Sequence, residues 1–157
     1  EEVAYAYEEL SKVSDQFTIA AAFGNVHGVY KPGNVKLTPK ILKNSQEYIT
    51  EKYGVSENHI DFVFHGGSGS TVEEIREAIG YGVIKMNVDT DTQYAFTRPI
   101  AEHMLKNYDG VLKVDGDVGN KKMYDPRGYL KKAETSMKER VIVAVKDLRG
   151  EGTTLGV

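Results

Sequence analysis

The sequence predicts an α/β fold built from parallel strand–helix units. Three short apolar runs of strand character, residues 17–23, 59–65 and 83–88, are each followed by a turn-rich segment and then by a helical pattern. Parallel strands that follow one another need a long crossover, and each of these connections is long enough to contain a helix. An open doubly wound sheet and a (β/α) barrel both satisfy this pattern.

The composition is that of an ordinary soluble globular protein. The 157 residues are 40% hydrophobic and 27% charged, and the net charge of -3 argues against nucleic acid as the main partner. There is no cysteine, so a bound metal would have to be held by histidine and carboxylate groups. The sequence contains neither a signal peptide nor a run of about 20 apolar residues, so we expect a cytoplasmic protein without a membrane partner.

The first predicted unit runs from residue 3 to residue 54. Residues 3–10 have the apolar spacing of a short amphipathic helix. Residues 17–23 (FTIAAAF) form a continuous apolar run that ends at Gly24, which is typical of a parallel strand covered on both faces. A loop follows, and Thr38 and Pro39 then predict the cap and first residue of a helix that ends near Gly54.

The second and third units follow the same order. After the predicted strand at 59–65, residues 71–74 (TVEE) form the pattern of a capping box, which starts a helix that ends at Gly80 and Gly82. A third strand is expected over residues 83–88, and the polar residues 89–92 (DTDT) cap a third helix that runs to about Lys106.

The last third of the chain is expected to contain one more helix. Residues 108–123 are rich in glycine, aspartate and lysine, which favours a long surface connection. Asp125 and Pro126 then begin the last predicted helix.

Polar and small residues follow all three predicted strands. They are Asn25 and His27 after the first, His65, Gly66, Gly67 and Ser68 after the second, and Asn87, Asp89 and Thr90 after the third. Each has an ordinary structural explanation on its own, such as a tight turn or a helix cap. Since the carboxyl ends of parallel strands form the functional edge of both βα architectures, their coincidence favours a site there.

Two histidines on neighbouring strand ends, His27 and His65, suit a divalent metal. A catalytic zinc takes three protein ligands. His59 lies at the opposite end of its predicted strand and His103 lies well along a helix, so we find no third ligand in this chain.

Two loops beside these histidines are rich in backbone N–H groups. Residues 66–68 and residues 87–90 follow adjacent strands, and such loops at the last strands of a barrel commonly hold a phosphate. A metal beside a phosphate pocket indicates a small phosphorylated carbonyl substrate, polarised by the metal as a Lewis acid.

Four motifs resemble class II (zinc-dependent) fructose-bisphosphate aldolases. They are residues 24–33 (GNVHGVYKPG), 65–70 (HGGSGS), 85–93 (KMNVDTDTQ) and 124–127 (YDPR). The resemblance covers essentially the whole chain. It implies that residues 1–157 are the C-terminal part of a single aldolase barrel domain, with the last three strands and terminal helices of a (β/α)8 TIM barrel, and that the N-terminal half is absent from this chain.

The resemblance also implies residue roles. His27 and His65 are two of the three zinc ligands, and Asn87 hydrogen-bonds the enediolate. The substrate-binding set, which includes the phosphate site for dihydroxyacetone phosphate and the contact of Asp89 with substrate hydroxyls, is Gly28, Gly66, Gly67, Ser68, Asn87, Val88, Asp89 and Thr90.

Two further features follow from the same resemblance. The carbonyls of Val26, Gly28 and Gly66 suit a monovalent cation, Na⁺ or K⁺, beside the phosphate. Arg127 corresponds to the arginine that reaches the neighbouring subunit's site and binds the far phosphate of the bisphosphate, which implies a homodimer or a higher homo-oligomer.

The implied reaction is the reversible aldol cleavage of fructose 1,6-bisphosphate to dihydroxyacetone phosphate and glyceraldehyde 3-phosphate, in glycolysis and gluconeogenesis, with zinc polarising the ketone. In the family the third zinc histidine, the catalytic aspartate and the mobile acidic loop belong to the N-terminal half. We therefore expect this chain alone to be inactive. The alternatives are a tagatose-bisphosphate aldolase and a non-catalytic, phosphate-binding half-barrel fragment.

Overall fold

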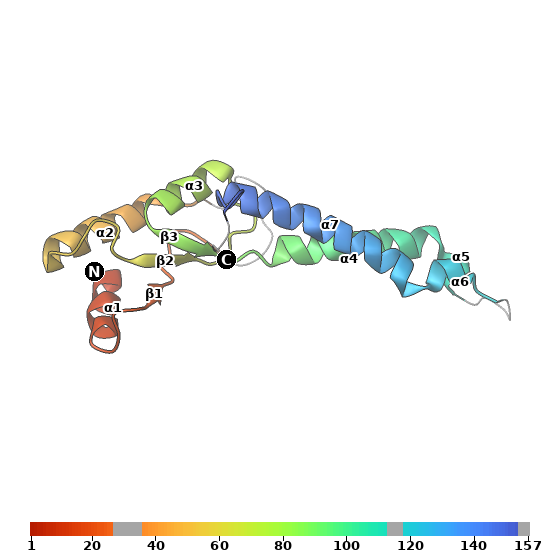
Figure 1. The fold of residues 1–157 in the computed structure, drawn as a ribbon, viewed down its shortest axis with the longest axis horizontal. Helices are drawn as coiled ribbons and strands as arrows, with labels where there is room; N and C mark the ends of the chain where they lie inside the picture. Colours follow the sequence, from red (N-terminus) through yellow and green to blue (C-terminus); the bar gives the residue numbers. More distant parts are fainter. Residues whose placement is uncertain (27–35, 113–117, 154–157) are drawn as a thin grey trace. The chain divides into compact units, whose positions relative to one another are not determined.

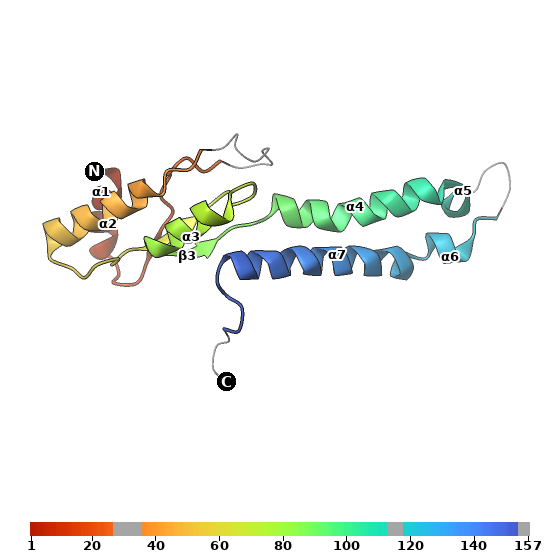
Figure 2. The same cartoon turned by 90° about the horizontal axis from the view of Figure 1, so that it is seen from above.

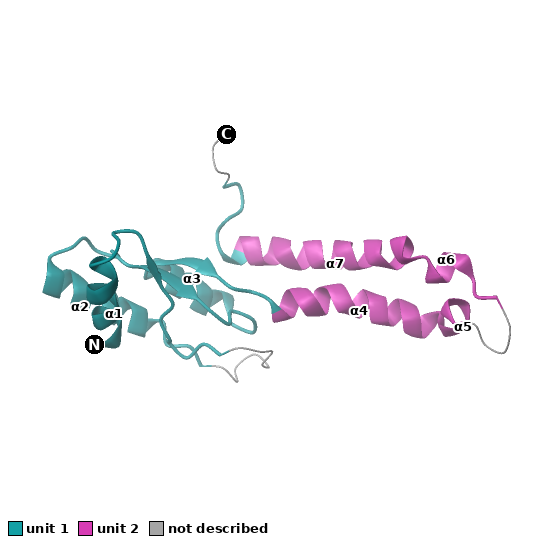
Figure 3. Cartoon of the chain, turned by 90° about the horizontal axis from the view of Figure 1, so that it is seen from below, with its two compact units in different colours: residues 1–89, 147–157 teal, residues 90–146 magenta. Residues whose placement is uncertain are grey.

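The computed structural model of the chain describes residues 1–26, 36–112 and 118–153. They fall into two units, residues 1–89 with 147–157 and residues 90–146 (Figure 3). The predicted site residues His27 and Gly28 lie outside the described residues.

A three-stranded parallel sheet forms the centre of the first unit. Its strands are β1 (Thr18–Ile19), β2 (Asp61–Phe64) and β3 (Val83–Met86), paired in the order β1-β2-β3 (Figure 1). The prediction of parallel strand–helix units is confirmed, and each strand lies beside the next one in the chain. The carboxyl ends of all three strands therefore meet at one edge of the sheet.

β1 is much shorter than the predicted strand over residues 17–23, so that prediction is wrong in length. The Phe23 amide donates to Oδ1 of Asn25 at 2.9 Å, and its carbonyl accepts from the Thr38 amide at 2.7 Å. The backbone of Phe23 thus bonds the loop that follows instead of β2.

β2 and β3 are also shorter than predicted. β2 begins at Asp61 instead of His59, because the carboxamide of Gln46 binds both the Ile60 amide, at 3.0 Å, and the Ile60 carbonyl, at 2.7 Å. β3 ends at Met86 instead of Val88. The Asn87 amide still donates to the Phe64 carbonyl at 2.9 Å, which keeps the two strand ends together.

Three helices belong to the first unit: α1 (Glu2–Ser11), α2 (Lys40–Tyr53) and α3 (Val72–Gly80). α2 and α3 lie on the same side of the sheet (Figure 1). The predicted capping box of α3 is present, and α2 ends at Gly54 in the left-handed conformation that glycine favours. The capping role predicted for Thr38 is wrong, because α2 begins after Pro39 without a side-chain cap.

The hydrophobic core lies between the sheet and these helices. The rings of Phe23 and Phe64 pack edge to face with centroids 4.8 Å apart, directly below the strand ends that carry the predicted site. The largest fully buried side chains are Phe23, Leu42, Ile49, Phe62 and Phe64. Each contributes about 1.5–3 kcal/mol by leaving water, so the strand ends rest on a well-packed support.

The second unit contains two long helices, α4 (Thr90–Lys106) and α7 (Pro126–Asp147), which lie side by side (Figure 2). Arg140 of α7 donates to Asp91 of α4 at 2.7 Å. The start of α7 agrees with the prediction. The predicted surface connection over residues 108–123 contains two short helices, α5 (Tyr108–Val111) and α6 (Lys121–Tyr124). In the part of the chain that the structure describes, no helix is both long and apolar enough to cross a bilayer.

Candidate functional site

The side chains of His65 and Asn87 meet at the carboxyl ends of β2 and β3. Nδ2 of Asn87 lies 2.9 Å from Nδ1 of His65. An amide nitrogen can only donate, so Nδ1 of His65 is the acceptor in this contact. The pairing of β2 with β3 brings these residues together although 22 positions separate them in the sequence.

Asn25 connects the end of β1 to the same point. Its Nδ2 donates to the His65 carbonyl at 2.8 Å, and its Oδ1 accepts from the Phe23 amide at 2.9 Å. His65 is therefore held through its ring by Asn87 and through its backbone by Asn25. The sequence placed Asn25 at this strand end without giving it a role.

The glycine turn after His65 approaches β3 closely. The Gly67 amide donates to the Asn87 carbonyl at 3.2 Å, and a Cβ at Gly67 would lie 2.7 Å from Cγ and Sδ of Met86. Gly66 has φ +64°, in the region that favours glycine. Both glycines are therefore required by local geometry, whatever else the turn does.

The N-terminus of α3, which follows this turn, is occupied by its own side chains. Oγ1 of Thr71 accepts from the Glu74 amide at 3.2 Å, and the Glu74 carboxylate accepts from the Thr71 amide at 2.9 Å. Among the donors near this edge, those of the turn are better placed to meet an anion than the capped helix end.

The other predicted substrate-binding residues occupy different environments. Ser68 is buried, with 6% of its surface exposed, Val88 is half-buried and Asp89 is exposed. Thr90 is the first residue of α4. Val26, predicted to offer a carbonyl to a cation, is 39% exposed.

The described residues supply part of a metal site. Within residues 1–26, 36–112 and 118–153, no group of three histidine, aspartate or glutamate side chains is placed to hold a metal ion. His65 offers an imidazole, which is a suitable zinc ligand, and its predicted partner His27 lies outside these ranges. The donor chemistry fits zinc, and the ligand set is incomplete in this part of the chain.

The other two histidines have structural contacts. The His59 ring packs against Tyr7 with centroids 5.6 Å apart. Nε2 of His103 lies 2.7 Å from the Met123 carbonyl, and its ring contacts Tyr129 at 5.3 Å. These contacts tie helices to neighbouring segments.

Arg127, in the second unit, is paired within its own turn. Its Nη2 lies 2.5 Å from Oδ2 of Asp125, while 85% of its side chain is exposed. The Arg127 side chain, and after it the Arg127 amide, lower the pKa of Asp125 to about 2. The guanidinium is thus oriented yet accessible.

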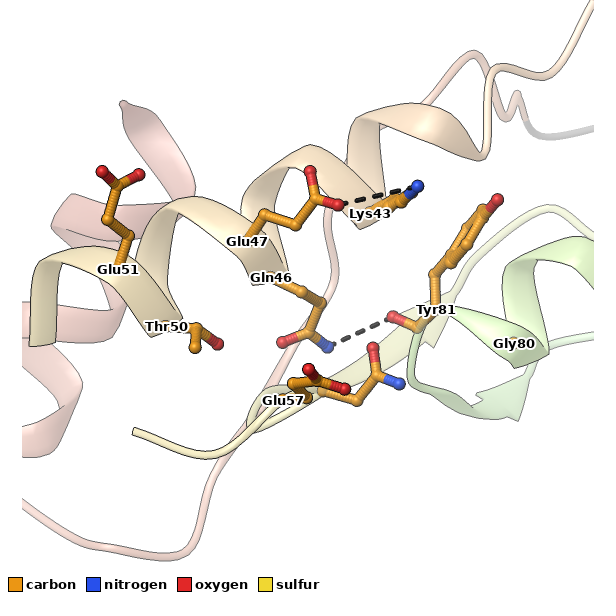
Figure 4. Close-up of a pocket in the computed structure, with 9 residues that line it drawn as sticks. Lys43, Gln46, Glu47, Thr50, Glu51, Glu57, Gly80 and Tyr81 are labelled. Carbon is orange, nitrogen blue, oxygen red and sulfur yellow. Dashed lines mark hydrogen bonds and ion pairs between the residues drawn. The ribbon is translucent and has the colours of Figure 1, made fainter. Parts of the chain in front are cut away.

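A cavity of about 430 Å³ lies at the opposite ends of the strands, beside Gln46 of α2 (Figure 4). Nε2 of Gln46 donates to the carbonyls of Ile60 and Tyr81, which precede β2 and β3. The sequence analysis missed this residue. Its signal is a polar side chain between Leu42 and Ile49 on the buried face of a helix.

Comparisons with known proteins identify one family. The family described as fructose-bisphosphate aldolase class-II matches residues 1–153. The fructose-bisphosphate aldolase of Mycobacterium leprae is 66% identical over 142 residues, which are 89% of this chain and 41% of the relative. That of Corynebacterium glutamicum is 63% identical over 141 residues, or 88% and 41% of the two chains. The chain thus spans about two-fifths of the length of these relatives.

Solved structures agree with these sequence matches. The crystal structure of fructose-bisphosphate aldolase from Campylobacter jejuni has a TM-score of 0.78 and 54% identity, and the match covers 94% of this chain and 44% of that one. The YdjI aldolase of Escherichia coli K12 has a TM-score of 0.62 at 21% identity, with 96% and 44% covered, and shares the fold.

Proposed function

The chain belongs to the class II fructose-bisphosphate aldolase family, and from this premise we propose that the protein containing it cleaves fructose 1,6-bisphosphate reversibly. The products are dihydroxyacetone phosphate and glyceraldehyde 3-phosphate. Residues 1–157 contribute the C-terminal part of a (β/α)8 barrel domain. The proposed setting is cytoplasmic glycolysis and gluconeogenesis.

The contact between His65 and Asn87 is the observation that carries this proposal. A potential metal ligand and a carboxamide donor lie 2.9 Å apart at adjacent strand ends, beside a glycine turn. Aldol cleavage leaves negative charge on the ketone oxygen of the departing three-carbon unit. Preorganised donors at that oxygen are usually the largest source of rate enhancement in such reactions.

We propose that His65 and His27 hold a catalytic zinc, with a third ligand from outside residues 1–157. When bound, zinc supplies Lewis-acid polarisation of the substrate carbonyl. The carbonyls of Val26, Gly28 and Gly66 are proposed to hold Na⁺ or K⁺ near the phosphate, since hard cations prefer oxygen ligands.

Asn87 is proposed to stabilise the enediolate. Its carboxamide has two N–H donors, and the contact with His65 occupies one of them. The second can donate to the oxygen on which negative charge develops. A carboxylate from outside residues 1–157 is proposed to move the proton.

The turn at residues 66–68 is proposed to hold the phosphate of dihydroxyacetone phosphate, together with Gly28 and residues 87–90. The Gly67 amide is already bound to the Asn87 carbonyl, so the amides of Gly66 and Ser68 are the proposed donors of the turn. Backbone N–H groups that converge in a turn form a good anion site. Asp89, which is exposed at the end of this region, is proposed to bind substrate hydroxyls.

Arg127 is proposed to bind the second phosphate of the bisphosphate in the site of a neighbouring subunit, so the assembly is at least a homodimer. Its exposed guanidinium has the fork geometry that suits bidentate contact with phosphate.

The test is a coupled assay of the complete protein with fructose 1,6-bisphosphate and, separately, with tagatose 1,6-bisphosphate. We expect faster cleavage of the fructose sugar, and its loss on chelation and recovery with zinc. Preference for the tagatose sugar would change the substrate while keeping the reaction. No cleavage of either sugar by a zinc-loaded dimer would contradict the proposal and favour a non-catalytic phosphate-binding protein.

A further inference from the structure

The carboxamide of Asn25 joins the ends of two strands. Its Nδ2 donates to the His65 carbonyl at 2.8 Å, and its Oδ1 accepts from the Phe23 amide at 2.9 Å. The first bond bridges 40 positions of sequence and the second bridges two. One side chain therefore fixes the backbone of His65 relative to the end of β1.

Asparagine is the short side chain that suits both partners at once. The Phe23 amide needs an acceptor and the His65 carbonyl needs a donor, and a carboxamide supplies one of each. An ionised aspartate has almost the same shape but only accepts. At this position it would keep the bond from Phe23 and place a negative oxygen against the His65 carbonyl.

The chain on both sides of the loop at residues 27–35 is closed at the same place. The Thr38 amide donates to the Phe23 carbonyl at 2.7 Å. Gly24 has φ +98°, and a Cβ there would lie 2.5 Å from the Lys36 carbonyl oxygen. Asn25 is thus the residue through which this closed stem, two positions before His27, contacts the segment that carries His65.

We infer that Asn25 is a positioning residue, which sets the backbone of His65 relative to the stem that leads to His27 so that both imidazoles meet one metal ion. The inference rests on the proposed function for the metal. Residues that orient metal ligands typically change metal affinity by about 10–100-fold when they are replaced.

The experiment compares Asn25→Asp with Gln46→Glu in the complete protein. Both variants replace a carboxamide that bonds backbone N–H and C=O groups, and they act at opposite ends of β2. Zinc affinity is measured by competition with a chelator, and the melting temperature is measured on the metal-free protein. Neither readout depends on catalysis.

We expect Asn25→Asp to weaken zinc binding by about 10–100-fold. Gln46→Glu should lower the melting temperature and leave zinc affinity within about twofold of the wild type, because Gln46 holds only the amino ends of the strands. Equal zinc affinity in Asn25→Asp and the wild type would overturn the inference, as would equal losses in the two variants.

Two additions keep the result interpretable. Asn25→Ser avoids the added charge and cannot span both partners, so it should also weaken zinc binding. Slow hydrogen exchange of the Phe23 amide is expected in the wild type, and exchange at the rate of an unstructured amide would overturn the inference without any variant. If the wild type cleaves no sugar bisphosphate while Asn25→Asp still loses zinc, the proposed function fails and the inference stands.

Discussion

Nδ1 of His65 accepts a hydrogen bond from Nδ2 of Asn87 at 2.9 Å, and this contact cannot coexist with metal ligation of that histidine. A neutral imidazole that binds a metal has the metal on one nitrogen and the proton on the other. Ligation through Nδ1 uses its lone pair, and ligation through Nε2 places the proton on Nδ1. In either case Nδ1 stops accepting, and the Asn87 amide is released toward the substrate.

Asn87→Ala is therefore expected to separate turnover from metal affinity. Turnover should fall by about 10²–10³-fold, as for the loss of one oxyanion donor. Zinc affinity should stay equal or rise by up to about tenfold, since a hydrogen bond worth about 1 kcal/mol no longer opposes ligation. Steady-state kinetics and chelator competition measure the two effects. A loss of zinc affinity would instead show that Asn87 supports the bound ligand.

His65→Ala should abolish zinc retention, because it removes a direct ligand. His59→Ala is the matched control: it deletes an exposed imidazole at the opposite end of the same strand, where the ring packs on Tyr7. Metal analysis after gel filtration should find zinc in the control alone. Full zinc occupancy in His65→Ala would remove His65 from the ligand set.

Gly67→Ala is expected to disturb the turn that we propose for the phosphate. The added Cβ would lie 2.7 Å from the Met86 side chain, whose flexible end can move at a cost of about 1–3 kcal/mol. We expect lower stability and a higher KM for the bisphosphate. Urea unfolding and steady-state kinetics test this.

Gly80→Ala supplies the control for that experiment. Gly80 is the last residue of α3, and a Cβ there would meet no other atom within 4 Å. Alanine should stabilise the protein by about 0.5–1 kcal/mol and leave KM unchanged. A normal KM in Gly67→Ala, with reduced stability, would give the turn a packing role only.

The parts of the fold that the sequence predicts well are those set by local signals. The capping box of α3 depends on two residues three positions apart, and the left-handed end of α2 depends on Gly54 alone. The parallel order of the strands follows from connections that each contain a helix. These features need no knowledge of distant contacts.

The errors arise where a distant side chain takes a backbone group away from the sheet. Gln46 binds the Ile60 backbone and shortens β2 at its start, and Asn25 binds the Phe23 amide beyond the end of β1. The bond from Asn25 to the His65 carbonyl spans 40 positions and has no pattern in the sequence. The strand ends were therefore identifiable as a site, while the residues that hold them were not.

Arg127→Ala is expected to raise KM for the bisphosphate with a smaller effect on turnover, because the proposed contact is with the far phosphate and not with the reacting carbons. Lys131→Ala is a suitable control, since Lys131 forms an equally exposed ion pair with Glu134 on the same helix. Kinetics with the bisphosphate test both variants. An unchanged KM in Arg127→Ala would leave no reason for a site shared between subunits.

The Asp125 carboxyl should report on the same arginine. Hydrogen bonds from the Arg127 side chain and amide lower its pKa to about 2, below the ordinary value near 4. A lowered folded-state pKa means that this pair favours the folded state fully above about pH 4, and that the contribution is lost as the pH falls through 2. Carbon NMR titration of Asp125 should give a midpoint near 2 in the wild type and a clearly higher one in Arg127→Ala, where only the amide remains. A wild-type midpoint near 4 would show that the guanidinium is not held by Asp125, and Arg127 would then have to be oriented by the phosphate itself.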